Sequence, residues 1–329
     1  MSRHTLKPAI KRGALIAAAN WQVTLVQASA DSLFKLLLAA PIIGGVFLVA
    51  LAVGSEPSAL ISLEWREMAA TVTESLTSRP VVLVAFLLAV AVVAVGGSLF
   101  IFLIKAGTVA TLVRSDRDAG PVEEPPLRVC MVARASRFSV DVYIGHSERL
   151  FPRYARLGFI LMAVYLVSGG LYLAAAYESG FRGDLGGLLT FIMTVGFVCW
   201  ITIVNLVYLL MQIVVATEDC SVAKAWRYVG AFVRQERRGV SAVFGVILVL
   251  VVTATGVSLL ATAALGLIAF VPFVGLAVLP LQLLAWVFRG VVFQFLGLTS
   301  IGAYLRLYRG FVSDDLVRRV PVTARPQPS

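Results

Sequence analysis

Long stretches without a charged side chain limit the fold of this sequence more than any other feature. The longest covers residues 239–288, and shorter ones cover 36–53, 80–104, 157–177 and 185–217. A helix needs about 20 apolar residues to cross the roughly 30 Å of hydrocarbon in a bilayer. The longest stretch exceeds one crossing, and Pro272 and Gly275 favour a turn between two helices within it. The sequence therefore predicts six membrane spans.

Composition agrees with a membrane protein and excludes the soluble classes. Of the 329 residues, 59% are hydrophobic and only 14% are charged, whereas an average soluble domain is about 25% charged. We predict an all-α, polytopic transmembrane helical bundle with amphipathic interfacial helices, forming a single membrane domain over 1–329. The expected spans are approximately 33–54, 80–104, 157–177, 188–217, 240–268 and 276–304. We also expect a flexible inner linker at about 116–127 and a flexible C-terminal tail at about 320–329.

Lysine and arginine divide unequally between the two sides that six spans define. Of the 28, 24 fall in segments 1–35, 105–156, 218–238 and 306–329, which share one side. Cytoplasmic loops carry such an excess. The sequence therefore predicts a multi-pass protein of the cell (cytoplasmic or inner) membrane with both termini in the cytoplasm. This placement explains the net charge of +10 by contact with the bilayer and its anionic lipid head groups, and not by binding nucleic acid.

Two segments have patterns that indicate surface or helix contacts. The inner segment 221–238 predicts a basic amphipathic helix, because its apolar side chains recur every three or four residues. Lipid anchoring is its expected role, and docking of a protein partner is the alternative. From Ala254 to Gly266 a small residue occupies every fourth position. Such spacing indicates close packing within the bundle, with a homo-oligomer contact as the alternative.

The side chains that most enzymes use are missing from the predicted spans. The two histidines, His4 and His146, lie outside them, and the uncharged stretches hold no Asp or Glu. The cysteines, Cys130, Cys199 and Cys220, are far apart, and no GxxxxGK[ST] phosphate loop occurs. We therefore expect no enzymatic activity, no metal site and no cofactor.

Two polar features inside the spans are candidate binding sites. Arg289 lies within the sixth predicted span, where a central arginine costs roughly 2.5–3.5 kcal/mol and should face protein or water. It could instead lie at the inner surface, if the span ends near Phe288. Bonding to helix carbonyls and contact with a ligand are further alternatives. One face of the fourth span carries a polar stripe, formed by Thr202, Asn205, Tyr208 and Gln212. Helix packing and a polar path for a substrate are the alternative roles of this stripe. We hypothesise that Arg289 and this stripe meet inside the bundle.

The segment between the fourth and fifth spans resembles part of a known group of proteins. Residues 215–232 follow the pattern V-A-T-E-D-C-S-V-x-x-A-W-x-x-x-x-x-F. The pattern is similar to that of bacterial and archaeal six-helix integral membrane proteins of unknown function, including the membrane domain fused to some glycerophosphodiester phosphodiesterases. This resemblance implies a six-helix bundle with an inner amphipathic connector. It does not imply the phosphodiesterase activity, which belongs to a separate soluble domain.

These observations favour a non-enzymatic integral membrane protein that organises the membrane or binds a partner. Such a role accounts for the missing catalytic groups and for the basic inner segments. The alternative is a transporter, or a permease subunit that relies on a separate ATPase. A transporter would use Arg289 and the polar stripe of the fourth span as its path.

Overall fold

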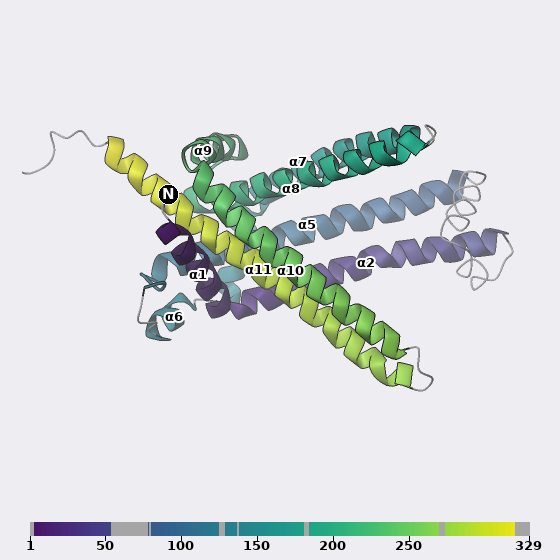
Figure 1. Ribbon diagram of the computed structural model, residues 1–329, viewed down its shortest axis with the longest axis horizontal. Coiled ribbons are helices and arrows are strands. Elements are labelled where there is room, and N and C mark those ends of the chain that lie inside the picture. The colour runs from purple at the N-terminus through teal and green to yellow at the C-terminus, as the bar shows by residue number, and fades with distance from the viewer. Residues whose placement is uncertain are drawn as a thin grey trace, which may run out of the picture. The chain divides into compact units, whose positions relative to one another are not determined.

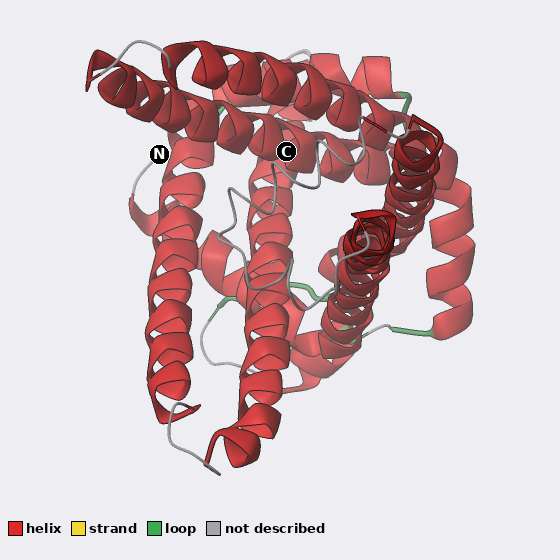
Figure 2. Ribbon diagram, turned by 90° about the vertical axis from the view of Figure 1, so that its right-hand side faces the viewer, coloured by secondary structure: helices red, strands yellow, loops and turns green. Residues whose placement is uncertain are grey.

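The computed structural model describes residues 3–53, 78, 80–124, 129–136, 138–180, 184–269 and 274–319. All regular secondary structure within these ranges is helical (Figure 2), so the predicted all-α class is confirmed. The expected C-terminal tail at about 320–329 lies outside the described residues. The helices are α1 (Arg3–Ala19), α2 (Trp21–Val53), α5 (Pro80–Asp118), α6 (Val129–Ala135), α7 (Val140–Gly180), α8 (Asp184–Glu218), α9 (Val222–Gln235), α10 (Arg237–Ala269) and α11 (Val274–Arg319).

Among the described residues, six helices are long and apolar enough to cross a membrane, and each overlaps one expected span. Their apolar segments are Trp21–Gly45, Leu83–Asp118, Val140–Ser179, Gly187–Glu218, Arg237–Ile268 and Pro280–Ser313. Several helices are longer than a crossing requires: α11 has 46 residues, or about 69 Å at 1.5 Å per residue. Because α11 is unbroken from Val274 to Arg319, no helix ends near Phe288. Arg289 therefore lies within a continuous helix.

Large apolar side chains on these six helices remain exposed. Leu166 of α7 is 72% exposed and Leu260 of α10 is 74% exposed, and many neighbours are similar. In water this exposure would be costly, at about 25 cal/mol per Å² of apolar surface. A lipid environment removes that cost, so the exposed apolar surface is what a membrane-embedded helix presents.

The contacts divide the chain into two compact units, whereas we expected one domain over 1–329. The first unit comprises Met1–Ala28 and Lys105–Ser329, and the second is Ser29–Ile104. In the second unit the ring of Phe34 occupies the space that a side chain at position 97 would fill, because that residue is Gly97. This unit holds most of α2 and the first part of α5, and neither segment contributes to the site described below.

In the first unit the long helices form two antiparallel pairs. Helices α7 and α8 lie side by side, as do α10 and α11 (Figure 1). Helix α1 packs on α11, where a Cβ at Gly302 would lie 2.7 Å from the Cα of Gly13. Only glycine at both positions allows the two backbones to approach this closely. This crossing fixes α1 near residue 302 of α11.

The buried core of the first unit lies at the end of the long helices that also carries α1, α6 and α9 (Figure 1). Its largest fully buried side chains include Tyr154, Tyr304, Tyr308 and Phe232. The Phe232 ring of α9 lies 5.5 Å from the Tyr308 ring of α11, between centroids. We call this region the basic end. It comprises α1, α6 and α9, the last turns of α5 and α8, the first turns of α7 and α10, and residues 299–319.

The first part of the expected flexible linker is fixed at the basic end. Helix α5 continues to Asp118, and Asp116, Ala119 and Val122 are at most 3% exposed. Gly120 adopts a positive φ of 64°, the left-handed conformation that commonly follows a helix end. The prediction rested on charge and proline content, which do not reveal that these charges are buried in ion pairs. Residues 125–128 lie outside the described ranges.

Candidate functional site

One group of charges at the basic end is fully occupied by mutual ion pairs. The Nε atom of Arg12, on α1, lies 2.5 Å from Asp116 Oδ1, and its Nη1 atom lies 2.6 Å from Glu123 Oε2. Arg309 of α11 pairs with Asp116. Arg306 Nε lies 3.2 Å from Glu123 Oε1. This cluster joins α1, α5 and α11, and its charges are committed to holding them together.

The cluster makes stability depend on pH. Burial alone would raise the pKa of Glu123, but a main-chain hydrogen bond and the charges of Arg12 and Arg306 lower that pKa below 4.5. A carboxylate with a lowered pKa stabilises the fold above its unfolded pKa and stops doing so as pH falls through its folded pKa. We expect the contribution of Glu123 to the melting temperature to stay level from neutral pH to about 4.5 and then to fall. Glu123→Gln should flatten this fall in thermal unfolding in detergent, and an identical acid limb would contradict the assignment.

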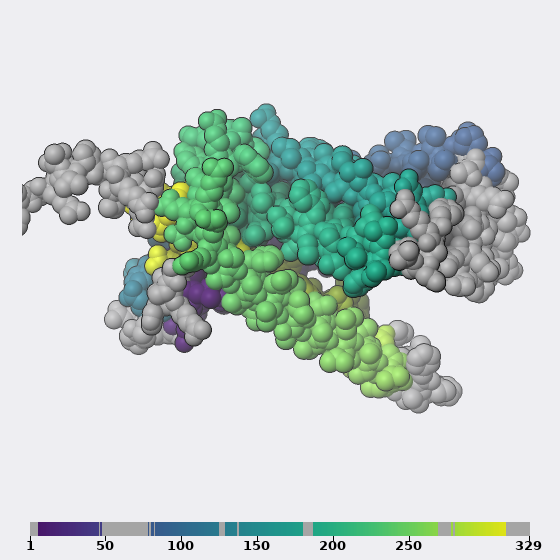
Figure 3. Space-filling view, turned by 45° about the horizontal axis from the view of Figure 1, so that its top comes forward, coloured from purple at the N-terminus to yellow at the C-terminus, as the bar shows by residue number. Residues whose placement is uncertain are grey.

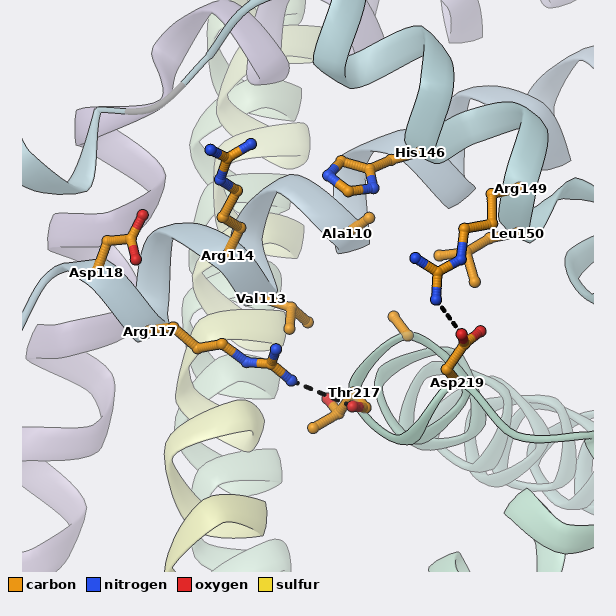
Figure 4. Close-up of a pocket in the computed structure, with 11 residues that line it drawn as sticks. Ala110, Val113, Arg114, Arg117, Asp118, His146, Arg149, Leu150, Thr217 and Asp219 are labelled. Carbon is orange, nitrogen blue, oxygen red and sulfur yellow. Dashed lines mark hydrogen bonds and ion pairs between the residues drawn. The ribbon is translucent and has the colours of Figure 1, made fainter.

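A second group of charges lines an open pocket of about 310 Å³ at the same end. The last turns of α5, the first turns of α7 and the end of α8 form its walls (Figure 4). We call it the basic pocket. Its ionisable side chains are Arg114, Arg117, Asp118, His146, Arg149 and Asp219. Arg114 and Arg117 are three residues apart on α5 and so share one helix face.

Asp219 organises one wall of the basic pocket. It follows α8 with a positive φ of 48° and accepts hydrogen bonds from Arg149 and Arg153 of α7. These two bonds lower the pKa of Asp219, so it stays ionised. Ser221 is the N-cap residue of α9, but its side chain makes no capping bond. The role of Asp219 could not be read from the sequence, because its partners lie 66 and 70 residues away.

Arg114 differs from the other arginines of the basic pocket, because no described residue pairs with its charge. Within the described part of the chain it forms no hydrogen bond or ion pair, and it is exposed. Arg117, by contrast, donates to the main-chain oxygen of Thr217 at 3.2 Å. Figure 4 shows Arg114 and His146 on the same side of the basic pocket. The three arginines that line the pocket outnumber its two carboxylates, Asp118 and Asp219, so the pocket is left with a net positive charge. Guanidinium groups in this setting suit a phosphate or carboxylate.

The polar stripe of the fourth span faces neighbouring helices. Asn205 Oδ1 accepts a hydrogen bond of 2.6 Å from the Tyr165 hydroxyl of α7. Tyr208 is 7% exposed and Gln212 is 4% exposed. The main-chain oxygen of Gln212 accepts a bond of 2.8 Å from the Tyr154 hydroxyl. Thr202 Oγ1 bonds to a carbonyl within its own helix. The bonds to Tyr165 and Tyr154 join α8 to α7, whereas the Thr202 bond stays within α8.

Arg289 lies apart from that stripe. It lines a groove of about 630 Å³ between α10 and α11, together with Gln282 and Trp286. Its Cζ atom is 5.6 Å from the centroid of the Phe293 ring, and it makes no hydrogen bond or ion pair within the described residues. All lining side chains come from α10 and α11. The structure therefore does not bring Arg289 and the stripe together, because the stripe faces α7 whereas Arg289 faces the groove of the other helix pair.

Metal chemistry has no support in the part of the chain that the structure describes. No group of three or more His, Cys, Asp or Glu side chains there could hold a metal ion. Cys130 and Cys199 are exposed, Cys220 is buried, and all three are free.

Six apolar helices with exposed hydrophobic faces define a multi-pass helical membrane protein. No family model, no curated protein and no solved structure matches this chain. Function is therefore inferred from the basic pocket and its surroundings.

Proposed function

We propose that this chain is a non-enzymatic protein of the cytoplasmic (inner) membrane that organises lipids by binding anionic head groups in the basic pocket. The basic end would lie at the cytoplasmic leaflet, with both termini in the cytoplasm. The distribution of 24 of 28 Lys and Arg residues to one side supports this orientation, since positive charge is retained in the cytoplasm. Inner-leaflet lipids supply anionic phosphates at that depth.

The observation that carries the proposal is the unpartnered Arg114 in a pocket of net positive charge. The Arg12 cluster shows that this fold can satisfy its arginines when they serve structure. An arginine that forms no ion pair with a described residue, in a pocket that it lines together with Arg117 and Arg149, is placed to bind an external anion. A hydrogen bond to a charged group contributes about 1.5–3 kcal/mol, enough to select an anionic lipid from neutral neighbours.

The transport alternative has less support. It requires polar groups along the fourth span that remain available to a substrate. Asn205 is bonded to Tyr165, and Tyr208 and Gln212 are buried. Docking of a protein partner on 221–238 stays an alternative for the outward face of α9, which carries Lys224, Arg227 and Arg234.

Arg114→Gln tests the proposal without removing a structural contact. We expect wild-type protein, released from nanodiscs of equal phosphatidylglycerol and phosphatidylcholine, to retain phosphatidylglycerol selectively in native mass spectrometry. The variant should retain one fewer phosphatidylglycerol, with an affinity at that site about tenfold lower, as expected for the loss of one charged hydrogen bond.

Arg134→Gln is the matched control, because Arg134 is an exposed arginine of α6 at the same end that does not line the pocket. It should retain lipid as the wild type does. Equal phosphatidylglycerol retention by Arg114→Gln and wild type would contradict head-group binding in the basic pocket.

A further inference from the structure

A separate groove lies where α7, α8 and α9 meet. Its volume is about 630 Å³, and Figure 3 shows α9 on the surface beside the α7–α8 pair. Its walls are apolar except for one arginine: Arg156, Leu157 and Ile160 of α7, Met211 of α8, and Ala223 and Trp226 of α9 line it. We call it the α9 groove. Nothing in the basic pocket depends on it, since the two share no lining residue.

The α9 groove lies at the boundary between the charged and apolar parts of α7. His146, Arg149, Arg153 and Arg156 follow one another at spacings of three, four and three residues, so they share one helix face. Residues 157–177 then contain no charge. A boundary of this kind lies at the head-group level of a bilayer. The groove therefore opens where lipid head groups give way to acyl chains.

Trp226 is an exposed part of the apolar face of α9. The apolar neighbours Ala225, Val229 and Phe232 are at most 4% exposed, whereas Trp226 is 62% exposed. Tryptophan is enriched at membrane interfaces, where its ring meets acyl chains and its N–H group meets polar groups. Its position at the rim of the α9 groove suits contact with a lipid chain.

Arg156 supplies an unpaired charge at the same rim. Arg149 and Arg153 are bonded to Asp219, but Arg156 forms no hydrogen bond or ion pair within the described ranges and is exposed. An apolar groove with one free guanidinium at its mouth matches an amphiphile that has an anionic head. A soluble anion would leave the apolar walls uncovered.

We propose that the α9 groove holds one acyl chain of an anionic phospholipid, whose phosphate binds Arg156. This site is distinct from the basic pocket. It would bind the lipid through its acyl chain as well as through its phosphate.

The chain contains a natural comparison for this site. A second apolar groove, of about 720 Å³, is lined by α7 and α8 and includes Trp200 but no charged residue. It should accept lipid chains without regard to head-group charge. Trp200 and Trp226 therefore report on two grooves of similar size that differ in the presence of an arginine.

Fluorescence quenching distinguishes the two grooves. Variants that keep only Trp226 or only Trp200, with Phe at the other tryptophan positions, are reconstituted in phosphatidylcholine vesicles. Brominated phosphatidylglycerol or brominated phosphatidylcholine is then added at the same mole fraction. We expect Trp226 to prefer the anionic quencher about fivefold, the factor for one basic residue near a membrane surface. Trp200 should be quenched equally by both lipids.

Three substitutions in the Trp226-only protein complete the test. Arg156→Gln should abolish the anionic preference, whereas Arg234→Gln, an exposed arginine of α9 outside the groove, should preserve it. Ala223→Leu should narrow the groove and reduce quenching by both lipids. The proposal would be overturned if the anionic preference survived Arg156→Gln, or if Trp200 preferred the anionic quencher as strongly as Trp226 does. Unchanged quenching in Ala223→Leu would also overturn it. Arg114→Gln should leave Trp226 quenching unchanged, so failure of this site and failure of the basic pocket are distinguishable.

Discussion

Asp116→Asn is expected to lower the free energy of unfolding by about 3–5 kcal/mol, the cost of breaking a buried ion pair by removing one partner. The Asp116 side chain is 0% exposed and pairs with both Arg12 and Arg309. Asparagine keeps the size of the side chain but removes its charge, so two arginines lose their counter-ion in a region shielded from water. Unfolding in mixed detergent micelles would measure the change.

Asp31→Asn provides the control for this prediction. Asp31 pairs with Lys35 at 2.7 Å on an exposed helix face, and such surface pairs contribute only about 0–1 kcal/mol. If Asp116→Asn destabilises the protein no more than Asp31→Asn does, the Arg12 cluster does not hold the basic end together.

Arg289→Leu is expected to stabilise the protein in a bilayer, by up to the roughly 2.5–3.5 kcal/mol that an arginine costs at the centre of a span. Among the interactions of Arg289 with described residues, leucine would give up the contact with the Phe293 ring, whose centroid lies 5.6 Å from the guanidinium carbon. Thermal unfolding in nanodiscs would measure the effect. This expected gain follows from the groove geometry, because no side chain of the polar stripe reaches Arg289.

The depth of Arg289 follows from its position along α11. At 1.5 Å per residue, Arg289 lies about 23 Å of helix after Val274, where α11 begins, and about 20 Å before Gly302. Gly302 is where α1 crosses α11. Gln282→Leu, in the same groove, is the neutral control and should change stability less. A loss of stability in Arg289→Leu would contradict the expectation. If Arg289→Lys shared that loss, the guanidinium group itself would be bonded within the bundle; if it did not, the positive charge would be the stabilising feature.

Charge-free length was enough to predict the helices that can cross a membrane. Each expected span overlaps a helix of the structure, and the basic amphipathic segment 221–238 contains α9. These features depend on neighbouring residues in the chain, so periodicity and composition report them directly. The division into two units and the fixing of residues 116–124 depend on distant contacts, and the sequence alone did not predict them.

For the candidate sites, too, the sequence identified unusual residues but not their contacts. Arg289, Asn205, Tyr208 and Gln212 stood out because polar side chains are rare in apolar spans, but rarity does not identify a neighbour. Asn205 bonds to Tyr165, which lies 40 residues away in the sequence. Arg289 lines the groove between α10 and α11. Arg114 and Arg156 were inconspicuous among many basic residues. Only the structure shows that no described residue pairs with their charges.

By itself, the sequence determined that this chain has six apolar segments of membrane-crossing length and that its positive charge gathers between particular segments, because hydrophobicity and charge are properties of each residue. The tertiary structure decided which arginines pair with a carboxylate and which, in the described part of the chain, do not. An ion pair such as Arg12 with Asp116 joins residues 104 positions apart, and a pairing over that distance exists only once the helices have packed.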